Sequence, residues 1–149
     1  MSHSQKAVDY FKQGYNCCQS VFAAFADEMN LDFETALRLS SSFGGGMGRL
    51  REVCGAVSGM FMVAGMLYGY CELDDTKKME HYKLIQELAN KFKQKNYDTI
   101  ICRELLKELS VDSSPIPSKR DAEYYKVRPC VKFVEDATEI LDELILSKE

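Results

Sequence analysis

Six cysteines are the residues of this 149-residue chain that could do chemistry, because thiolates bind metals and attack disulfides. Two of them, Cys17 and Cys18, are adjacent in the segment FKQGYNCCQSVF. Neighbours on a helix point about 100° apart, so only one of the two can lie on an apolar stripe. Cys18 has helical spacing to Val21 and Phe22. We therefore expect Cys18 to pack in the core and Cys17 to be the functional thiol.

Four cysteines are each expected in the first turn of a different helix. They are Cys17, Cys54, Cys102 and Cys130. A helix start carries about half a positive charge, so a thiol there should ionise more readily. Arg103 beside Cys102 and Arg128 near Cys130 could strengthen the effect, or either could simply face solvent. Cys18 and Cys71 are expected to be small buried hydrophobes, since Cys71 follows a helix end, where the dipole disfavours an anion.

Apolar spacing and capping residues predict helices almost throughout, and no alternating β-branched run indicates a strand. The expected helices cover residues 5–13, 17–29, 33–43, 53–70, 75–96, 99–109 and 130–146. Asn16 with Gln19 forms a capping-box pattern, while Asp98 and Pro129 are expected to open the last two helices. Residues 110–125 are expected to form a loop. We predict an all-α, single-domain multi-helix bundle over residues 1–149, built around a glycine-rich central helix.

Residues 53–71 form an uncharged segment of nineteen residues, which meets the length of a membrane-spanning helix. Four of the nineteen are glycine and no second such segment exists, so we expect a buried central helix and no membrane span. Gly55 and Gly59 lie one turn apart and give a small face on which another helix could pack. The same face could pair with a second copy of the chain in a homo-oligomer.

A glycine run precedes this helix. Gly44, Gly45 and Gly46 begin the segment GGGMGR, which could cradle a phosphate. However, neither the Walker nor the dinucleotide spacing is present. We expect a tight turn whose backbone amides lie near Cys54, and we take these three glycines and Gly55 as candidate backbone contacts for a cofactor.

Charge and the N-terminal sequence limit the function classes. The net charge is −4 and no long basic run occurs, so nucleic acid is not an expected partner. The N-terminal segment does not resemble a secretory signal, which indicates a cytoplasmic protein with reduced thiols. His3 and His81 are the only histidines and are expected at the surface, so no Cys–His catalytic pair is predicted.

The motifs GYNC, FGGGMG before CGAVSG, CRELL and RPCVKFV together resemble a bacterial family of redox-active proteins named after the pattern C…GCAxxG…C…C. The resemblance covers nearly the whole chain. Cys54 and Gly55 stand in the order C-G rather than G-C, which turns a helical side chain by about 100°. The resemblance implies that the four cysteines act together in a redox or metal-carrying protein, with a redox partner and, in many members, a gene near a transporter.

Three functions remain open at this level, and whether the protein is an enzyme is open as well. The first is a zinc or iron–sulfur site held by the four thiolates, which has no C-x-x-C pair and would form only on folding. The second is thiol–disulfide exchange with a partner cysteine from another helix. The third is a structural or interaction domain with inert thiols.

Overall fold

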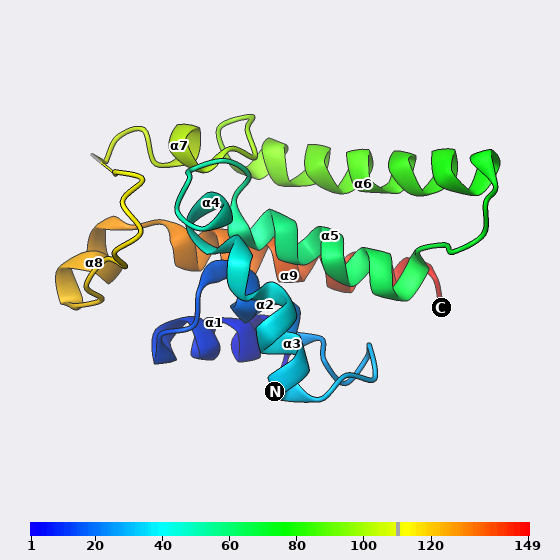
Figure 1. Cartoon of the computed structure of the whole chain (residues 1–149), viewed down its shortest axis with the longest axis horizontal. Coiled ribbons are helices and arrows are strands. Elements are labelled where there is room, and N and C mark those ends of the chain that lie inside the picture. Colours follow the sequence, from blue (N-terminus) through cyan, green and yellow to red (C-terminus); the bar gives the residue numbers. More distant parts are fainter. Residues whose placement is uncertain (110) are drawn as a thin grey trace.

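A computed structural model describes residues 1–109 and 111–149, and within these ranges the chain is all-α, as expected (Figure 1). The elements are α1 (His3–Gln13), α2 (Cys17–Ala24), α3 (Phe33–Ser40), a 3-10 turn η1 (Ser41–Phe43), α4 (Gly44–Met47), α5 (Gly55–Tyr68), α6 (Asp75–Lys95), α7 (Cys102–Leu105), α8 (Ala122–Val127) and α9 (Cys130–Ser147). The described ranges contain no strand, only one antiparallel β-bridge, between Val53 and Ile101.

The glycine-rich α5 is the centre of the bundle, and it packs against α2, α6 and α9. Its inward face is completely buried at Val57, Met60 and Val63. A side chain at Gly59 would place its Cβ 3.0 Å from the carbonyl oxygen of Cys18. The expected small face is therefore confirmed, because its missing side chains let α2 approach the α5 backbone.

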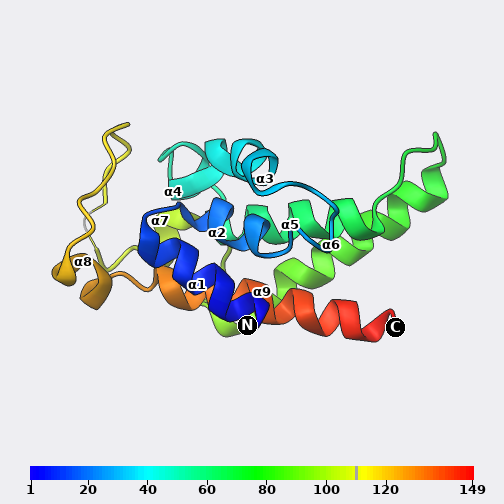
Figure 2. The same ribbon diagram turned by 90° about the horizontal axis from the view of Figure 1, so that it is seen from below.

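The uncharged segment 53–71 is helical over only 14 residues, which is too short to cross a membrane. Within the part of the chain that the structure describes, no other helix combines the length and the apolar character of a membrane span. Figure 2 shows α1 lying along α9, so the two ends of the chain close one side of the bundle.

Helix starts follow the capping residues at two of the expected places. The Asn16 side chain accepts a 2.9 Å bond from the Gln19 N–H, and the Gln19 side chain accepts a bond from the Asn16 N–H. Asp74 caps α6 without such a reciprocal bond, since its side chain accepts bonds from the N–H groups of Thr76 and Lys77. The second helix, in contrast, ends at Ala24 and not near Met29, because the next two N–H groups bond to carbonyls three residues back and tighten the turn.

The helix expected over residues 99–109 begins later and is much shorter. Asp98 has a positive φ of 57° and caps nothing; α7 starts at Cys102. The reason is a tertiary contact, because the backbone of residues 100–102 forms hydrogen bonds with residues 52–54. The N–H of Cys54 donates to the carbonyl of Ile100 at 2.8 Å, and the N–H of Cys102 donates to the carbonyl of Glu52 at 2.6 Å.

Two further expectations need correction. Within the expected loop 110–125, of which Ser110 lies outside the described residues, Asp121 accepts a bond from the Tyr124 N–H and caps α8. Pro129 is the N-cap of α9 and not its first residue. The expected tight turn at the glycine run is present, because within the short α4 (residues 44–47) Gly45 and Gly46 adopt left-handed backbone angles.

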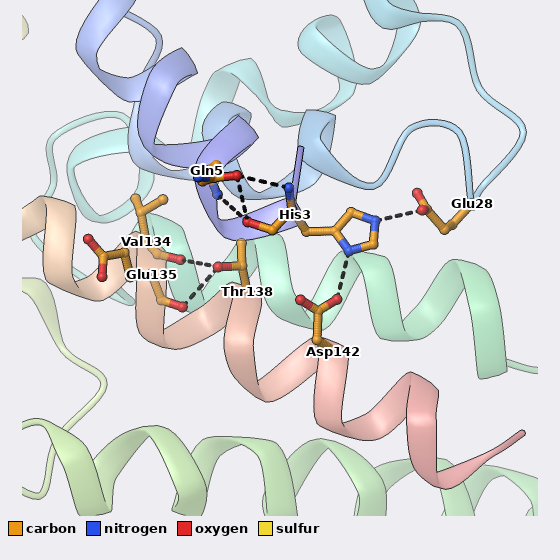
Figure 3. Close-up of polar contacts among 8 residues, drawn as sticks. His3, Gln5, Glu28, Val134, Glu135, Thr138 and Asp142 are labelled. Carbon is orange, nitrogen blue, oxygen red and sulfur yellow. Dashed lines mark hydrogen bonds and ion pairs between the residues drawn. The ribbon is translucent and has the colours of Figure 1, made fainter.

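His3 is only partly exposed and not a free surface residue, because its ring contacts α9 on one side and residues at the end of α2 on the other (Figure 3). Nδ1 lies 2.7 Å from Asp142 of α9 and Nε2 lies 2.5 Å from Glu28. The ring also stacks on Phe25 with 4.1 Å between centroids. His81 is half-buried as well, with its ring edge against Tyr70. His3 therefore connects the start of α1 to α9 and to the turn that follows α2.

Candidate functional site

A cavity of about 460 Å³ lies where α2, α5, α7 and α9 begin, a volume in the range of small-molecule sites. Helices α4, α7 and α8 gather at this end of the bundle (Figure 1). Four cysteines line the cavity. They are Cys17, Cys54, Cys102 and Cys130, the four that the sequence singles out. The fold thus brings together residues that are far apart in the chain.

Each of the four cysteines stands at a helix start. Cys17, Cys102 and Cys130 are the first residues of α2, α7 and α9, and Cys54 is the N-cap of α5. Cys54 and Cys102 each follow a residue of the Val53–Ile101 bridge, so backbone hydrogen bonds fix their relative position. The sequence contains no signal for this bridge, because it joins single residues and not strands.

Two of the four thiols are electrostatically coupled. The interaction with the Cys17 thiol is the main reason why the pKa of Cys130 is lowered to about 7. The same interaction, together with burial, raises the pKa of Cys17 well above its ordinary value. The coupled pair therefore loses its first proton near pH 7, with the charge favoured at Cys130, and holds its second proton into the alkaline range.

Neighbouring groups support the Cys130 thiolate. The positive charges of Arg128 and Arg120 and a hydrogen bond from the Tyr124 hydroxyl also lower its pKa, against the effect of burial. Arg128 stacks on the Tyr124 ring at 5.1 Å, which holds both groups beside the sulfur. Sequence reasoning found Arg128 through its place in the motif RPC, but Tyr124 and Arg120 carry no comparable signal.

The other two thiols of the cavity do not ionise readily. Burial raises the pKa of Cys54 to about 12, although the N–H groups of Val57 and Ala56 oppose this shift. Burial also raises the pKa of Cys102, although Arg51 Nη1 lies 3.7 Å from its sulfur. The expectation of an acidic thiol at each helix start is therefore wrong for Cys54 and Cys102, because the loss of water outweighs the effect of the helix start. It is also wrong for Cys17, whose pKa is raised first by its interaction with Cys130 and then by burial.

The remaining two cysteines lie away from the cavity. Cys18 is fully buried, its thiol is 3.8 Å from the sulfur of Met62, and burial raises its pKa to about 12. Its expected packing role is confirmed. Cys71 is exposed and not buried, because α5 ends at Tyr68 and Cys71 lies beyond it in the connection to α6.

The candidate glycines line the same cavity. They are Gly44, Gly45, Gly46 and Gly55. A Cβ added at Gly46, whose φ is +72°, would lie 2.7 Å from the Cβ of Cys102. One added at Gly55 would lie 3.2 Å from the Cβ of Cys17 and 2.9 Å from the carbonyl oxygen of Phe43. These two glycines let the cysteine-bearing helices approach closely.

Four arginines line the cavity and were mostly missed by sequence reasoning. They are Arg49, Arg51, Arg120 and Arg128. Arg103, the other arginine next to a cysteine, instead pairs with Glu52 at 2.8 Å and is half exposed. The difference could not be read from sequence, because the positions of the loop arginines depend on contacts such as that from Arg120 to the Tyr15 carbonyl.

The chemistry of the donor set suits zinc or iron, yet the donors do not converge. Among the described residues, no three cysteine, histidine or carboxylate side chains lie close enough together to hold a metal ion. The interaction that does exist joins two thiols, Cys17 and Cys130. The arrangement therefore fits a dithiol pair better than a tetrahedral site.

The fold and the cavity define an all-α protein in which four cysteines and four arginines line one cavity. The protein family described as "Putative redox-active protein (C_GCAxxG_C_C)" matches residues 15–144, and the chain belongs to this family. The resemblance seen in the sequence is thereby confirmed. The chain matches no curated protein and no solved structure.

Proposed function

We propose that the chain is a thiol–disulfide redox protein whose active pair is Cys17 and Cys130. The observation that carries the proposal is that these two thiols line one cavity and interact, with the pKa of Cys130 lowered to about 7. A thiol with a pKa near the ambient pH combines a large thiolate fraction with high nucleophilicity.

The chemistry has two steps. The Cys130 thiolate attacks one sulfur of a substrate disulfide, a mixed disulfide forms, and the first substrate thiolate leaves. Cys17 then gives its proton to that leaving thiolate, attacks the Cys130 sulfur and releases the second substrate thiolate, which takes a proton from water. The protein loses two electrons and gains the Cys17–Cys130 disulfide, while the substrate is reduced to two thiols. A separate thiol compound, acting as the reductant, then reverses these steps and restores the Cys17–Cys130 dithiol.

The surroundings of the pair have distinct roles in this proposal. Arg128 and Tyr124 stabilise the thiolate, and the cavity gives a small substrate access to it. Cys54 and Cys102 stay protonated near neutral pH and do not compete as nucleophiles.

A four-thiolate zinc or iron–sulfur site is the second candidate, and the observation in its favour is that four cysteines line one cavity. Arginines on the same wall would offset the charge of the thiolates. Such a group would supply electron transfer or a structural cross-link, and it requires the sulfurs to move together.

Metal analysis and thiol counting test these alternatives. The protein is purified without oxygen, bound iron, sulfide and zinc are measured, and thiols are counted in denaturant before and after mild oxidation. We expect no stoichiometric metal and a reversible loss of two of the six thiols, mapped by peptide mass spectrometry to Cys17 and Cys130. About one zinc or one cluster per chain would favour the metal site. Six thiols unchanged by oxidant, without metal, would mean that the cysteines are inert.

A further inference from the structure

A buried guanidinium group faces the cavity without being fully paired. Arg51 is only 6% exposed, and its Nε donates to the carbonyl of Asp112 at 2.8 Å. Nη1 lies near the Cys102 sulfur, while Nη2 is buried and finds no hydrogen-bond partner among the residues that the structure describes. A buried charged donor without a partner is unfavourable, so this atom points to an acceptor that binds here.

The electrostatics of the cavity favour an anion. Arg49, Arg120 and Arg128 line it together with Arg51, and none of the described lining residues is aspartate or glutamate. Arg49 forms an ion pair with Asp112, whose exposed side chain lies 3.6 Å from it. Even after one charge is balanced by the Cys130 thiolate, the wall stays positive.

The size and burial of the site favour a small molecule over a protein. The volume of about 460 Å³ is that of a small-ligand pocket, and Cys130 and Cys102 are each only 7% exposed. A disulfide on the surface of a folded protein could not reach the Cys130 sulfur in this setting, whereas a short flexible disulfide could.

We propose that the cavity binds a low-molecular-weight disulfide that carries carboxylate groups, with Arg51 Nη2 donating a hydrogen bond to one carboxylate. The proposal rests on the proposed function and names its substrate class. Arginine suits this role because its planar fork binds carboxylate oxygens in pairs. Anchoring the carboxylate beside Cys102 leaves the disulfide to meet the Cys130 thiolate within the same cavity, where the two-step exchange described above takes place.

Two matched disulfides test the charge requirement. The probes are 3,3′-dithiodipropionate, a dianion, and bis(2-hydroxyethyl) disulfide, which is neutral and of similar size. We expect kcat/KM of the intact protein to be roughly tenfold to a hundredfold higher for the dianion. Arg51→Gln should remove most of this preference, which is read as the ratio of the two kcat/KM values. Arg38→Gln, a change at an exposed position of α3 outside the cavity, should alter neither rate.

Two further measurements decide the question even if Arg51→Gln does not fold. The first is a salt series with the unmodified protein, and the second uses another variant. With the unmodified protein, the rate with the dianion should fall as sodium chloride rises from about 0.05 to 0.5 M, and the rate with the neutral probe should stay constant. If Arg51→Gln does not fold by circular dichroism, Arg128→Gln takes its place, compared by the ratio of the two rates. Equal rates with both probes and equal salt dependence would overturn the proposal while leaving thiol exchange intact.

Binding is also measured without reaction. In a Cys17→Ser, Cys130→Ser double variant, calorimetry with 3,3′-dithiodipropionate should detect binding, which Arg51→Gln should weaken roughly tenfold or more. This result would support the anion site even if no thiol exchange were found. Absence of binding in the folded double variant, with Arg51 in place, would overturn it.

Discussion

Cys17 and Cys130 line the same cavity and interact with each other, so the first residue of α2 comes together with the first residue of α9. This arrangement is possible because α1 and α2 both pack against α9 and close the bundle on itself. The pair joins an early and a late part of the chain, and its chemistry therefore depends on the complete tertiary fold.

Thiol reactivity should have a midpoint near neutral pH. The pKa of Cys130 is lowered to about 7, so its alkylation by iodoacetamide should rise with pH and level off above this value. Arg128→Gln removes a positive charge beside the sulfur and should move the midpoint to higher pH. The measurement is the rate of modification of the Cys130 peptide between about pH 5 and 10. A midpoint near the ordinary value of 9.0 would contradict the assignment.

Replacing the two adjacent cysteines should have opposite consequences. Cys17→Ser removes the resolving thiol, so the protein should no longer form its disulfide on oxidation. Cys18→Ala should retain disulfide formation but lose about 1 kcal/mol of stability, because Cys18 is fully buried against Met62. Thiol counts after oxidation and urea unfolding of both variants check this. Equal loss of disulfide formation in the two would defeat the assignment.

Stability of the reduced protein should fall at alkaline pH. Burial raises the pKa of Cys18 and Cys54 from 9.0 to about 12. Above pH 9 the unfolded chain releases these protons while the native protein keeps them, so the free energy of unfolding decreases. Cys130 acts in the opposite direction, between pH 7 and 9, because its pKa is lowered.

Cys18→Ala provides the control, since it removes one of the thiols with a raised pKa. Urea unfolding under reducing conditions at pH 9 and at higher pH should show a smaller decrease for this variant than for the unmodified protein. Identical decreases would mean that the Cys18 thiol is not protected from ionisation.

Two glycines of α5 should respond oppositely to alanine. Gly59→Ala places a Cβ 3.0 Å from the Cys18 carbonyl oxygen and 3.1 Å from the Val21 Cβ, so it should destabilise the protein by about 1–3 kcal/mol. At Gly65 no atom lies within 4 Å of the added Cβ, and Gly65→Ala should stabilise the helix by about 0.5–1 kcal/mol. Chemical denaturation of both variants measures the difference. Changes of the same sign would refute the packing of α2 on α5.

The clamp around His3 should contribute to stability. His3→Ala removes contacts to Asp142 and Glu28 and the stacking on Phe25, for an expected loss of about 1–3 kcal/mol. Lys6→Ala on the same helix should change stability by less than about 0.5 kcal/mol, because its ion pair spans 4.0 Å and its partner is exposed. Thermal unfolding compares the two, and similar small losses would show that the clamp is weak.

Local signals were read well from the sequence. The Asn16–Gln19 capping box places Cys17 at the start of α2, and the glycine spacing in α5 indicates the close approach of another helix. These features depend on residues within one or two turns. The same local reasoning singles out the four cysteines that line the cavity. It also predicts an acidic thiol at each helix start, because the cost of burying a thiolate depends on tertiary contacts that the sequence does not show.

Features that depend on distant residues could not be predicted. The start of α7 is set by backbone pairing of residues 100–102 with residues 52–54, which overrides the capping signal of Asp98. The role of Arg51 likewise depends on the Asp112 carbonyl, which a loop brings to it. Sequence shows which residue types are present, and only tertiary contacts decide which of them share a cavity.

The Val53–Ile101 bridge also has a consequence for how the chain can change in length. Helices α5 and α6 leave the cysteine site at Cys54 and return to it at Ile100, so together they form a long hairpin whose base is tied by backbone hydrogen bonds. Its tip, residues 69–74, points away from α4 and α7 (Figure 1). Insertions or deletions at this tip should leave the reactive sulfurs in place, which makes it a suitable point for attaching a reporter domain.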